Sequence, residues 1–265
     1  MTRSKLLMVG AGRMAEAILS GIVKNKKNSF EIITVTNSTD KKKLEQLKHK
    51  YSIQASGDWE SQLASHDIIL LATPPHTHED ILKKLASKID GQLIITVAAG
   101  IDPSFMEERL PRGTPVCWIM PNTAAQVGQS MSTYSCGKYV DKSHRKILSE
   151  ILSSIGVSEE FSEQHVHDLT AITGSSPAFV YAFVEALEES AIGYGVSSEQ
   201  ARKLVVNMFK GSIAMLEEGH DLKDLIQQVA SPGGSTAEGL EVLKKLDFSA
   251  IIKQAITATN NHARG

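Results

Sequence analysis

Five short, almost wholly apolar runs recur through the first 120 residues, and they constrain the fold more than any other feature of the chain. Charged, helix-prone segments such as 41–50 and 79–88 separate several of them. A strand that is apolar at nearly every position is buried on both faces, which requires a parallel sheet with helices on either side. The pattern therefore predicts a doubly wound α/β domain with strands at 5–9, 32–35, 67–72, 93–97 and 115–120.

The second part of the chain has a different pattern. Strand-like runs disappear after about Glu163, and apolar residues then recur at helical spacing. Ser197 followed by Gln200 forms a capping-box motif at the start of one such segment. We predict a doubly wound domain at 1–162 and an all-helical domain at 163–265, with helices at 177–194, 199–217, 222–229 and 234–245. The tail at 260–265 is expected to fray.

A glycine-rich motif follows the first predicted strand and opens a helix. It reads Gly10-Ala-Gly-Arg-Met-Ala15, which matches the dinucleotide fingerprint G-x-G-x-x-A. Gly10 would permit the tight turn, Gly12 would let a pyrophosphate approach the backbone, and Ala15 would let the helix pack close to the sheet. A structural glycine turn is the alternative, but the position of the motif favours cofactor binding.

The segment after the second strand bears on the choice of cofactor. An acidic residue there would bond the ribose diol of NAD, whereas this chain reads Thr36-Asn-Ser-Thr-Asp-Lys-Lys-Lys43. Hydroxyls, an amide and lysines suit a 2′-phosphate, so NADP(H) is favoured. Asp40 keeps NAD(H) possible, and the lysines also fit a solvated helix start.

A second anion site is predicted near the C-terminus, in the stretch Ser231-Pro-Gly-Gly-Ser-Thr236. With Ser231 as the N-cap and Pro232 as the first helical residue, the backbone N–H groups of Gly233, Gly234 and Ser235 would lie free at the positive end of the helix dipole. A small carboxylate fits such a site. The alternative is that Ser-Pro-Gly-Gly only marks the passage from a loop to a helix. The Thr236 hydroxyl is placed to donate a hydrogen bond to a substrate atom, or simply to cap or pack.

Composition and motif content exclude several other functions. The formal net charge of −2 indicates no nucleic-acid surface, and two cysteines without metal-ligand spacing fit free thiols in a reducing cytoplasm. No stretch has the length and apolarity of a membrane span, and no hydrolase or phosphate-loop motif is present. The pairs His76/His78 and His165/His167 lack metal-site spacing, so we expect loop or surface histidines and no metal.

Taken together, these motifs resemble the Δ1-pyrroline-5-carboxylate reductase family over nearly the whole chain. The resemblance rests on the stretches 10–17, 70–75, 97–101, 120–123 with 127–128, and 171–179 leading to 231–236. It implies NAD(P)H-dependent reduction of L-Δ1-pyrroline-5-carboxylate to L-proline. It also implies a Rossmann-type domain followed by a helical dimerisation domain, so that the protein is a homodimer or a higher oligomer whose active site uses both subunits.

The resemblance also implies which residues bind each ligand. Thr236 would lie beside the imine nitrogen as the catalytic residue, and the substrate carboxylate would be received by Ser231, Gly233, Gly234 and Ser235. The cofactor would contact Gly10, Gly12, Arg13, Met14, Asn37, Ala72, Thr73, Pro74, Ala99, Gly100 and Asn122.

Several positions depart from the family pattern. The usual Ala-Val-Lys-Pro reads Ala72-Thr-Pro-Pro75, so a cofactor-side lysine is missing. Ser38 stands where an arginine often follows Asn37, and Gln227 replaces an aspartate ahead of Ser-Pro-Gly-Gly. These departures leave two alternatives open, which are a related Rossmann imine or β-hydroxyacid reductase and a regulatory paralogue without turnover.

Overall fold

The computed structural model describes residues 4–25 and 30–263. The chain divides into two compact units, which are residues 1–175 with 260–265, and residues 176–259. This division falls a little after the predicted domain boundary at 162/163, which stays a prediction. In the described residues, none of the helices has the length and apolarity needed to cross a membrane.

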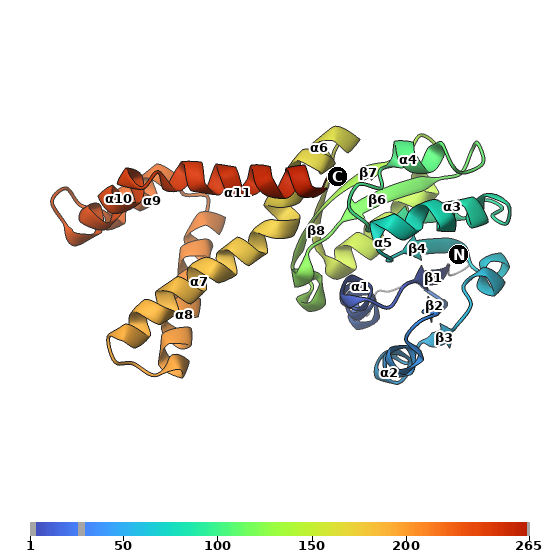
Figure 1. The fold of residues 1–265 in the computed structure, drawn as a ribbon, viewed down its shortest axis with the longest axis horizontal. Helices are drawn as coiled ribbons and strands as arrows, with labels where there is room; N and C mark the ends of the chain where they lie inside the picture. The colour runs from blue at the N-terminus through green and yellow to red at the C-terminus, as the bar shows by residue number, and fades with distance from the viewer. Residues whose placement is uncertain (1–3, 26–29, 264–265) are drawn as a thin grey trace. The chain divides into compact units, whose positions relative to one another are not determined.

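The first unit is built on one eight-stranded sheet with the order β3-β2-β1-β4-β5-β6-β7-β8 (Figure 1). Every neighbouring pair is parallel except β6 and β7, which are antiparallel. The strands are β1 (Lys5–Val9), β2 (Ile32–Thr36), β3 (Gln54–Ser56), β4 (Ile68–Leu71), β5 (Leu93–Thr96), β6 (Val116–Met120), β7 (Ser130–Cys136) and β8 (Gly156–Glu160). All residues of β4, β5 and β6 are buried, so the doubly wound parallel sheet predicted from the apolar runs is confirmed.

Helices cover both faces of this sheet. Alternate residues of β1 point to opposite faces, so Leu6 and Met8 pack in one core while Leu7 and Val9 pack in the other. The first core is closed by α1 (Arg13–Lys24), α2 (Lys41–Tyr51) and α5 (Lys142–Ile155). The second is closed by α3 (His78–Ala86), α4 (Pro103–Glu107), α6 (Glu163–Thr170) and the 3-10 segment η1 (Glu60–Ser65).

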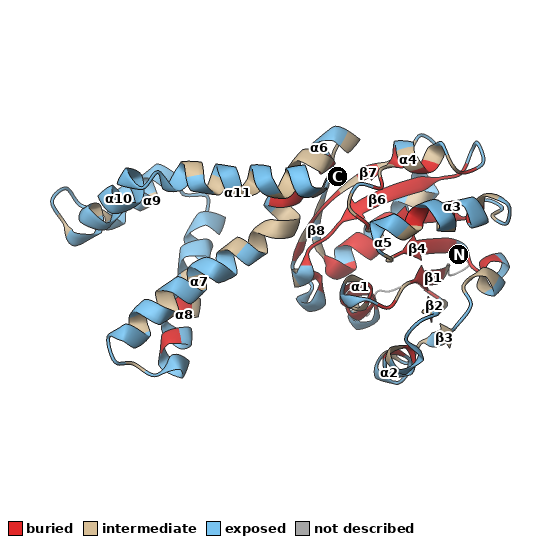
Figure 2. Cartoon of the chain, viewed as in Figure 1, coloured by how far each residue is buried: buried red, intermediate tan, exposed pale blue. Residues whose placement is uncertain are grey.

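The second unit is wholly helical, as predicted. Its helices are α7 (Ser176–Gly193), α8 (Ser198–Glu217), α9 (Leu222–Val229), α10 (Ser235–Lys245) and most of α11 (Phe248–Ala263). The predicted capping box at Ser197 and Gln200 is present. Among residues 176–259, all of which the structure describes, only Ala201 and Val205 are buried, and Figure 2 shows the contrast with the buried sheet.

The C-terminal helix corrects one prediction. Residues 260–263 are helical rather than frayed, while 264 and 265 lie outside the described residues, and Asn260 forms hydrogen bonds within the first unit. Its side-chain oxygen accepts a hydrogen bond from the Ala171 N–H (3.1 Å), and its amide donates to the Asp168 carbonyl (2.8 Å). Asn260 therefore fixes the turn of π-helix at Ala171–Ser175 that follows α6.

Candidate functional site

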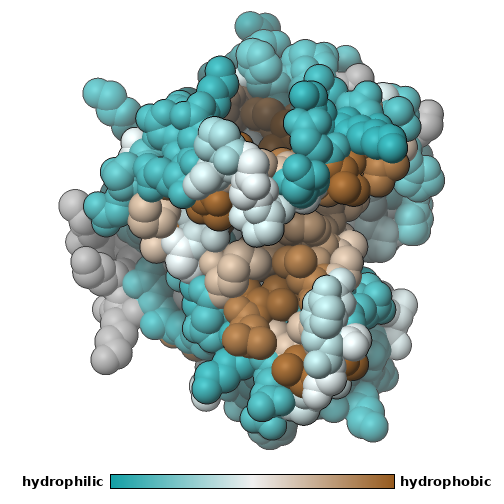
Figure 3. Space-filling model, turned by 90° about the vertical axis from the view of Figure 1, so that its left-hand side faces the viewer, coloured by the Kyte–Doolittle hydropathy of each residue, from teal (hydrophilic) through white to brown (hydrophobic). Residues whose placement is uncertain are grey.

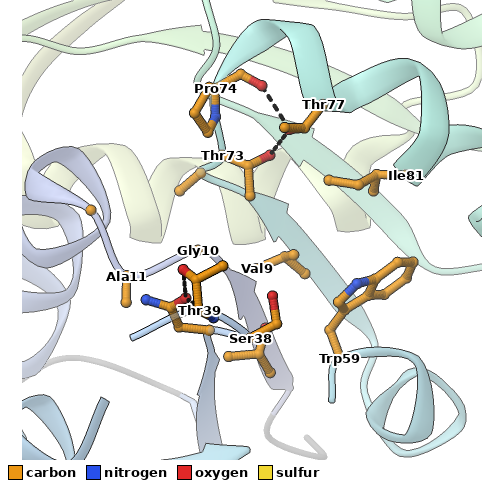
Figure 4. A pocket seen from close by; sticks show the side chains of 14 residues that line it. Val9, Gly10, Ala11, Ser38, Thr39, Trp59, Thr73, Pro74, Thr77 and Ile81 are labelled. Carbon is orange, nitrogen blue, oxygen red and sulfur yellow. Dashed lines mark hydrogen bonds between the residues drawn. The ribbon is translucent and has the colours of Figure 1, made fainter. Parts of the chain in front are cut away.

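A cavity of about 500 Å³ lies where the chain reverses direction across the sheet (Figure 4). The neighbouring strands β1 and β4 are followed by connections that leave in opposite directions, which is where doubly wound sheets bind ligands. The cavity is lined by Val9, Gly10, Ala11, Gly12, Thr36, Asn37, Ser38, Thr39, Trp59, Ala72, Thr73, Pro74, Thr77 and Ile81.

Gly10 is required by the backbone at the floor of this cavity. Its φ is +113°, and its N–H donates to the Thr36 carbonyl at 3.0 Å. A Cβ atom at this position would lie 2.5 Å from the Ala72 carbonyl oxygen. The loop after β1 can therefore pass close to the loop after β4 only with glycine at position 10.

Gly12 plays a different role, as the N-cap of α1. Its backbone is extended (φ −71°), no side chain caps the helix, and a Cβ built on it meets nothing within 4 Å. The space beside Gly12 is thus open, and the first N–H groups of α1, from Arg13 and Met14 onward, face the end where the helix dipole is positive. These features fit the pyrophosphate of a dinucleotide.

The loop after β2 is organised around Asn37. Its side-chain oxygen accepts hydrogen bonds from the N–H and the hydroxyl of Thr39, both at 3.0 Å. Asp40 caps α2 by accepting from the Lys43 N–H at 2.8 Å, so its carboxylate has a structural partner. Ser38 and Thr39 both line the cavity.

One of the three lysines that follow this loop is neutralised by a carboxylate. Lys43 forms an ion pair with Glu16 of α1, and Lys50 contacts the other oxygen of the same carboxylate at 2.8 Å. Hydrogen bonds from Lys43 first, and then from Lys50, lower the pKa of Glu16 from 4.5 to about 2. The positive charge that sequence analysis assigned to a 2′-phosphate site is thus partly balanced within the protein.

The loops after β4 and β5 are joined by a buried histidine. His78 Nδ1 donates to the Pro74 carbonyl (3.2 Å), and its Nε2 accepts from the Thr96 hydroxyl (2.8 Å). The oxygen of that hydroxyl accepts in turn from the Ala98 N–H. His78 is fully buried, so the prediction of a surface or loop histidine is wrong for this residue. Desolvation by burial lowers its pKa, and the ring is therefore neutral at physiological pH.

The remaining histidines of the two pairs are not joined in a metal site. His167 Nε2 donates to the Asp102 carboxylate (2.9 Å) and its ring packs on Trp118, whereas His76 and His165 are exposed. Among the described residues, no cluster of three or more histidine, cysteine or acidic side chains is arranged to hold a metal ion.

Only part of the predicted cofactor set lines the cavity. Asn122 uses one amide N–H to donate to the Thr173 carbonyl (2.9 Å), and its side-chain oxygen accepts from the Ala124 N–H (2.9 Å), so a second amide N–H and a second oxygen lone pair are left over. The predicted residues in the lining are Gly10, Gly12, Asn37, Ala72, Thr73 and Pro74, while Arg13, Met14, Ala99, Gly100 and Asn122 lie outside it. Sequence reasoning missed Trp59, Thr77 and Ile81, which belong to no motif.

The second predicted site lies at the start of α10, three residues later than predicted. Gly234, rather than Ser231, is the N-cap, and no side chain caps the helix. Gly233 has φ +74°, and the Gly234 N–H donates back to the Ser231 carbonyl at 2.9 Å, which makes Ser231 to Gly234 a turn. The prediction of a free Gly234 amide is therefore wrong, and the N–H groups of Ser235 and Thr236 open the helix instead.

Thr236 lies in the first turn of α10 and borders a cavity of about 410 Å³ within the helical unit. Apolar side chains of α8, α9 and α10 form most of the lining, including Met215, Leu222, Ile226, Val229 and Leu240. Within the described part of the chain, the Thr236 hydroxyl has no hydrogen-bond partner. Thr236 therefore neither caps the helix nor closes a polar network.

Comparisons with known proteins match both parts of the chain to family models. Residues 163–265 match the family model of pyrroline-5-carboxylate reductase dimerisation, and residues 5–100 match that of the NADP oxidoreductase, coenzyme F420-dependent. Pyrroline-5-carboxylate reductase 2 of Bacillus subtilis is 32% identical, with 96% of this chain and 92% of the relative aligned.

Solved structures give the same result. The Plasmodium falciparum pyrroline carboxylate reductase, crystallised with NADP bound, has a TM-score of 0.89 at 28% identity and covers 100% of this chain and 98% of its own. The enzyme of Streptococcus pyogenes has a TM-score of 0.90 at 26% identity, with 100% and 99% covered.

The fold and the cavity at the β1/β4 switch point define a Rossmann-type oxidoreductase that uses a nicotinamide dinucleotide. The match of residues 163–265 to the dimerisation model identifies a particular family within this class of oxidoreductases. The chain belongs to the pyrroline-5-carboxylate reductase family.

Proposed function

We propose that this protein reduces L-Δ1-pyrroline-5-carboxylate to L-proline with a nicotinamide dinucleotide as the hydride donor. The proposal rests on the presence of two features in a chain of this family: a cavity suited to a dinucleotide at Gly10–Gly12, and a helix start without a side-chain cap at Ser235 and Thr236. When bound, the reduced nicotinamide supplies the hydride.

The start of α10 is the proposed binding site for the substrate carboxylate. The N–H groups of Ser235 and Thr236 have no partner within the described residues, and they lie at the positive end of an eleven-residue helix. Two N–H donors and the dipole favour a carboxylate there. Gly233 and Gly234 support the site by forming the turn before α10, and no side chain caps this helix.

Thr236 is the proposed hydrogen-bond donor to the imine nitrogen. Its hydroxyl is free and lies one residue into the helix that would hold the carboxylate. The imine is already electrophilic, so the protein needs only to orient it and help protonate its nitrogen, and a strong general base is unnecessary.

NADPH is the proposed preferred cofactor. Two residues that carry hydroxyls, Ser38 and Thr39, line the cavity after β2, and the one carboxylate in that loop, Asp40, is engaged in capping α2. A carboxylate with a structural partner is less available to the ribose diol of NADH. The expected result is a larger kcat/KM for NADPH than for NADH, and the reverse order would contradict the proposal.

A homodimer formed through the helical unit is the proposed assembly. Only two of its residues are buried, while many large apolar side chains are exposed, among them Tyr181 (63%), Leu204 (60%) and Ile251 (53%). Apolar side chains gather in a hollow on the face shown in Figure 3. Apolar exposure on this scale indicates a surface that is covered by another chain. Sedimentation equilibrium tests for the dimer.

The cytoplasm is the proposed compartment. Cys117 and Cys136 are both free thiols, which fits a reducing environment. Fractionation of cells that express a tagged full-length chain checks this.

Reduction is tested by following NADPH absorbance with pyrroline-5-carboxylate as the substrate. Thr236→Ala should lower kcat by about 10- to 100-fold, at or below the low end of the range for proton donors, because water can also protonate the imine. Thr236→Ser should retain most of the rate. Thr257→Ala serves as the control, since that hydroxyl only bonds the Lys253 carbonyl of its own helix. Binding of NADPH without any turnover by the wild-type protein would instead support a regulatory paralogue.

A further inference from the structure

Trp59 stands in the cofactor cavity although it belongs to no recognised motif. It follows β3 and immediately precedes η1, and its indole ring and the side chain of Ile81 lie side by side at one end of the cavity (Figure 4). Trp59 is partly exposed and packs against the second hydrophobic core. It therefore offers an aromatic surface to the cavity from a supported position.

Ion pairs hold the segment that carries Trp59 against α3. The neighbouring Glu60 receives Lys84 at 2.8 Å and also pairs with Lys88, both from α3. The N–H of Glu60 donates to Asp58 at 2.9 Å, which fixes the turn before η1. Because α3 also carries Ile81, these contacts hold the ring and the isoleucine in a constant relation.

The other end of the cavity determines which part of the cofactor reaches this ring. The pyrophosphate fits beside Gly12 at the start of α1, and the hydroxyl-bearing loop Asn37–Thr39 lies where the adenosine ribose would follow. The next group along the dinucleotide is the adenine base. An aromatic and an aliphatic side chain are suited to the two faces and edges of a purine.

We propose that Trp59 forms one wall of the adenine subsite and stacks on the base, with Ile81 completing the apolar slot. This inference rests on the proposed function only for the class of cofactor. It makes Trp59 a binding residue that acts on the adenosine half and leaves the nicotinamide half untouched.

Tryptophan fluorescence tests this placement directly, because the chain has two tryptophans and the other, Trp118, is fully buried. The probes are 2′,5′-ADP, which is the adenosine half of NADP, and nicotinamide mononucleotide, which is the other half. The first should quench the emission of the full-length protein and protect it from acrylamide. The second should do neither.

Substitutions then assign the signal and the affinity. Trp59→Phe should abolish the quenching while leaving the Trp118 emission, and it should weaken 2′,5′-ADP binding only slightly because a ring remains. Trp59→Ala should weaken that binding by about 5- to 150-fold in calorimetric titration. Ser61→Ala, on the same segment but outside the cavity lining, is the control and should bind as the wild type does.

The outcomes separate this inference from the proposed function. If 2′,5′-ADP binds with unchanged emission, or if Trp59→Ala binds it with wild-type affinity while remaining folded by circular dichroism, Trp59 is not in the adenine subsite. Normal stacking with no reduction of pyrroline-5-carboxylate would leave the inference standing and overturn only the function. Failure of both halves and of NADPH to bind would overturn both.

Discussion

Alanine substitutions at Gly10 and Gly12 should have opposite consequences, although the two glycines are neighbours in one motif. Gly10 has φ +113°, and its added Cβ would lie 2.5 Å from the Ala72 carbonyl oxygen. Gly12 has φ −71°, and its added Cβ meets nothing within 4 Å. We therefore expect Gly10→Ala to damage the fold and Gly12→Ala to damage mainly cofactor binding.

The cost at position 10 has two parts. A left-handed backbone costs an L-residue about 1–3 kcal/mol. The close approach to Ala72 must then be relieved by a backbone shift that weakens the bonds Gly10 N–H to Thr36 and Ala72 N–H to Val9, each worth about 1 kcal/mol net. The free energy of unfolding should fall by about 2–5 kcal/mol, which lowers the melting temperature by roughly 5–15 °C for a chain of this size.

At position 12, the substitution should weaken cofactor binding more than it lowers the stability of the fold. Alanine caps a helix less well than glycine, so about 0.5–1 kcal/mol of stability is lost. The added methyl group occupies the space through which the pyrophosphate approaches the N–H groups of α1. The dissociation constant for NADP⁺ should therefore rise by about tenfold or more, corresponding to about 1.4 kcal/mol.

Two measurements decide the matter. Thermal unfolding by circular dichroism without ligand reports the fold, and calorimetric titration with NADP⁺ reports the site. Melting of Gly10→Ala at the wild-type temperature would refute the argument from backbone strain. Wild-type affinity in Gly12→Ala would refute the placement of the pyrophosphate.

Three further predictions concern titratable groups. The pKa of Glu16 is about 2 in the fold against 4.5 ordinarily, so its ionised form stabilises the protein above pH 4.5, and this contribution is lost as the pH falls toward 2. Between pH 4.5 and pH 2, the free energy of unfolding of Glu16→Gln should therefore fall by about 1–2 kcal/mol less than that of the wild type. His78→Phe should lower the free energy of unfolding by about 1–3 kcal/mol and raise KM for NADPH more than it lowers kcat, because the Pro74 carbonyl loses its imidazole partner. If the control variant Thr257→Ala changed stability and KM as much as His78→Phe does, this explanation would be wrong. Burial raises the pKa of the Cys117 thiol, so one thiol per native chain, Cys136, should react with a disulfide reagent, and both should react after denaturation.

The parts of the fold that were predictable are those in which local sequence and burial agree. The runs that form β4, β5 and β6 are buried at every residue, which their nearly continuous apolar pattern predicts. The strand β7 (Ser130–Cys136) was not predicted, because it consists largely of serine and threonine and is buried only through its neighbours in the sheet. The pairing of Cys117 opposite Cys136, with the sulfur atoms 3.9 Å apart, follows from that unseen strand.

The errors at the sites have similar physical causes. Ser231 followed by a proline matches a helix start by composition, but Gly233 takes a left-handed conformation and closes a turn first, which delays the helix to Ser235. The burial of His78 depends on contacts with Pro74, in the loop after β4, and with Thr96, the last residue of β5. Sequence motifs predicted the glycine-rich part of the cofactor site, whereas residues such as Trp59 line the cavity only because the sheet brings their loops together.

The missing lysine after β4 can be understood from the same contacts. The carbonyl of Pro74 accepts hydrogen bonds from the N–H of Thr77 (3.0 Å), the Thr77 hydroxyl (2.7 Å) and His78 Nδ1 (3.2 Å), and all three reach it from the following helical segment. Position 74 is therefore fixed through its main chain, and its side chain is free to change without moving the loop. Replacing a lysine by proline there removes a positive charge from the cavity but keeps its shape. With that charge absent, we expect the N–H groups at the start of α1 and the proposed apolar contact with the base to contribute more to dinucleotide binding, so substitutions at Gly12 and Trp59 should weaken it.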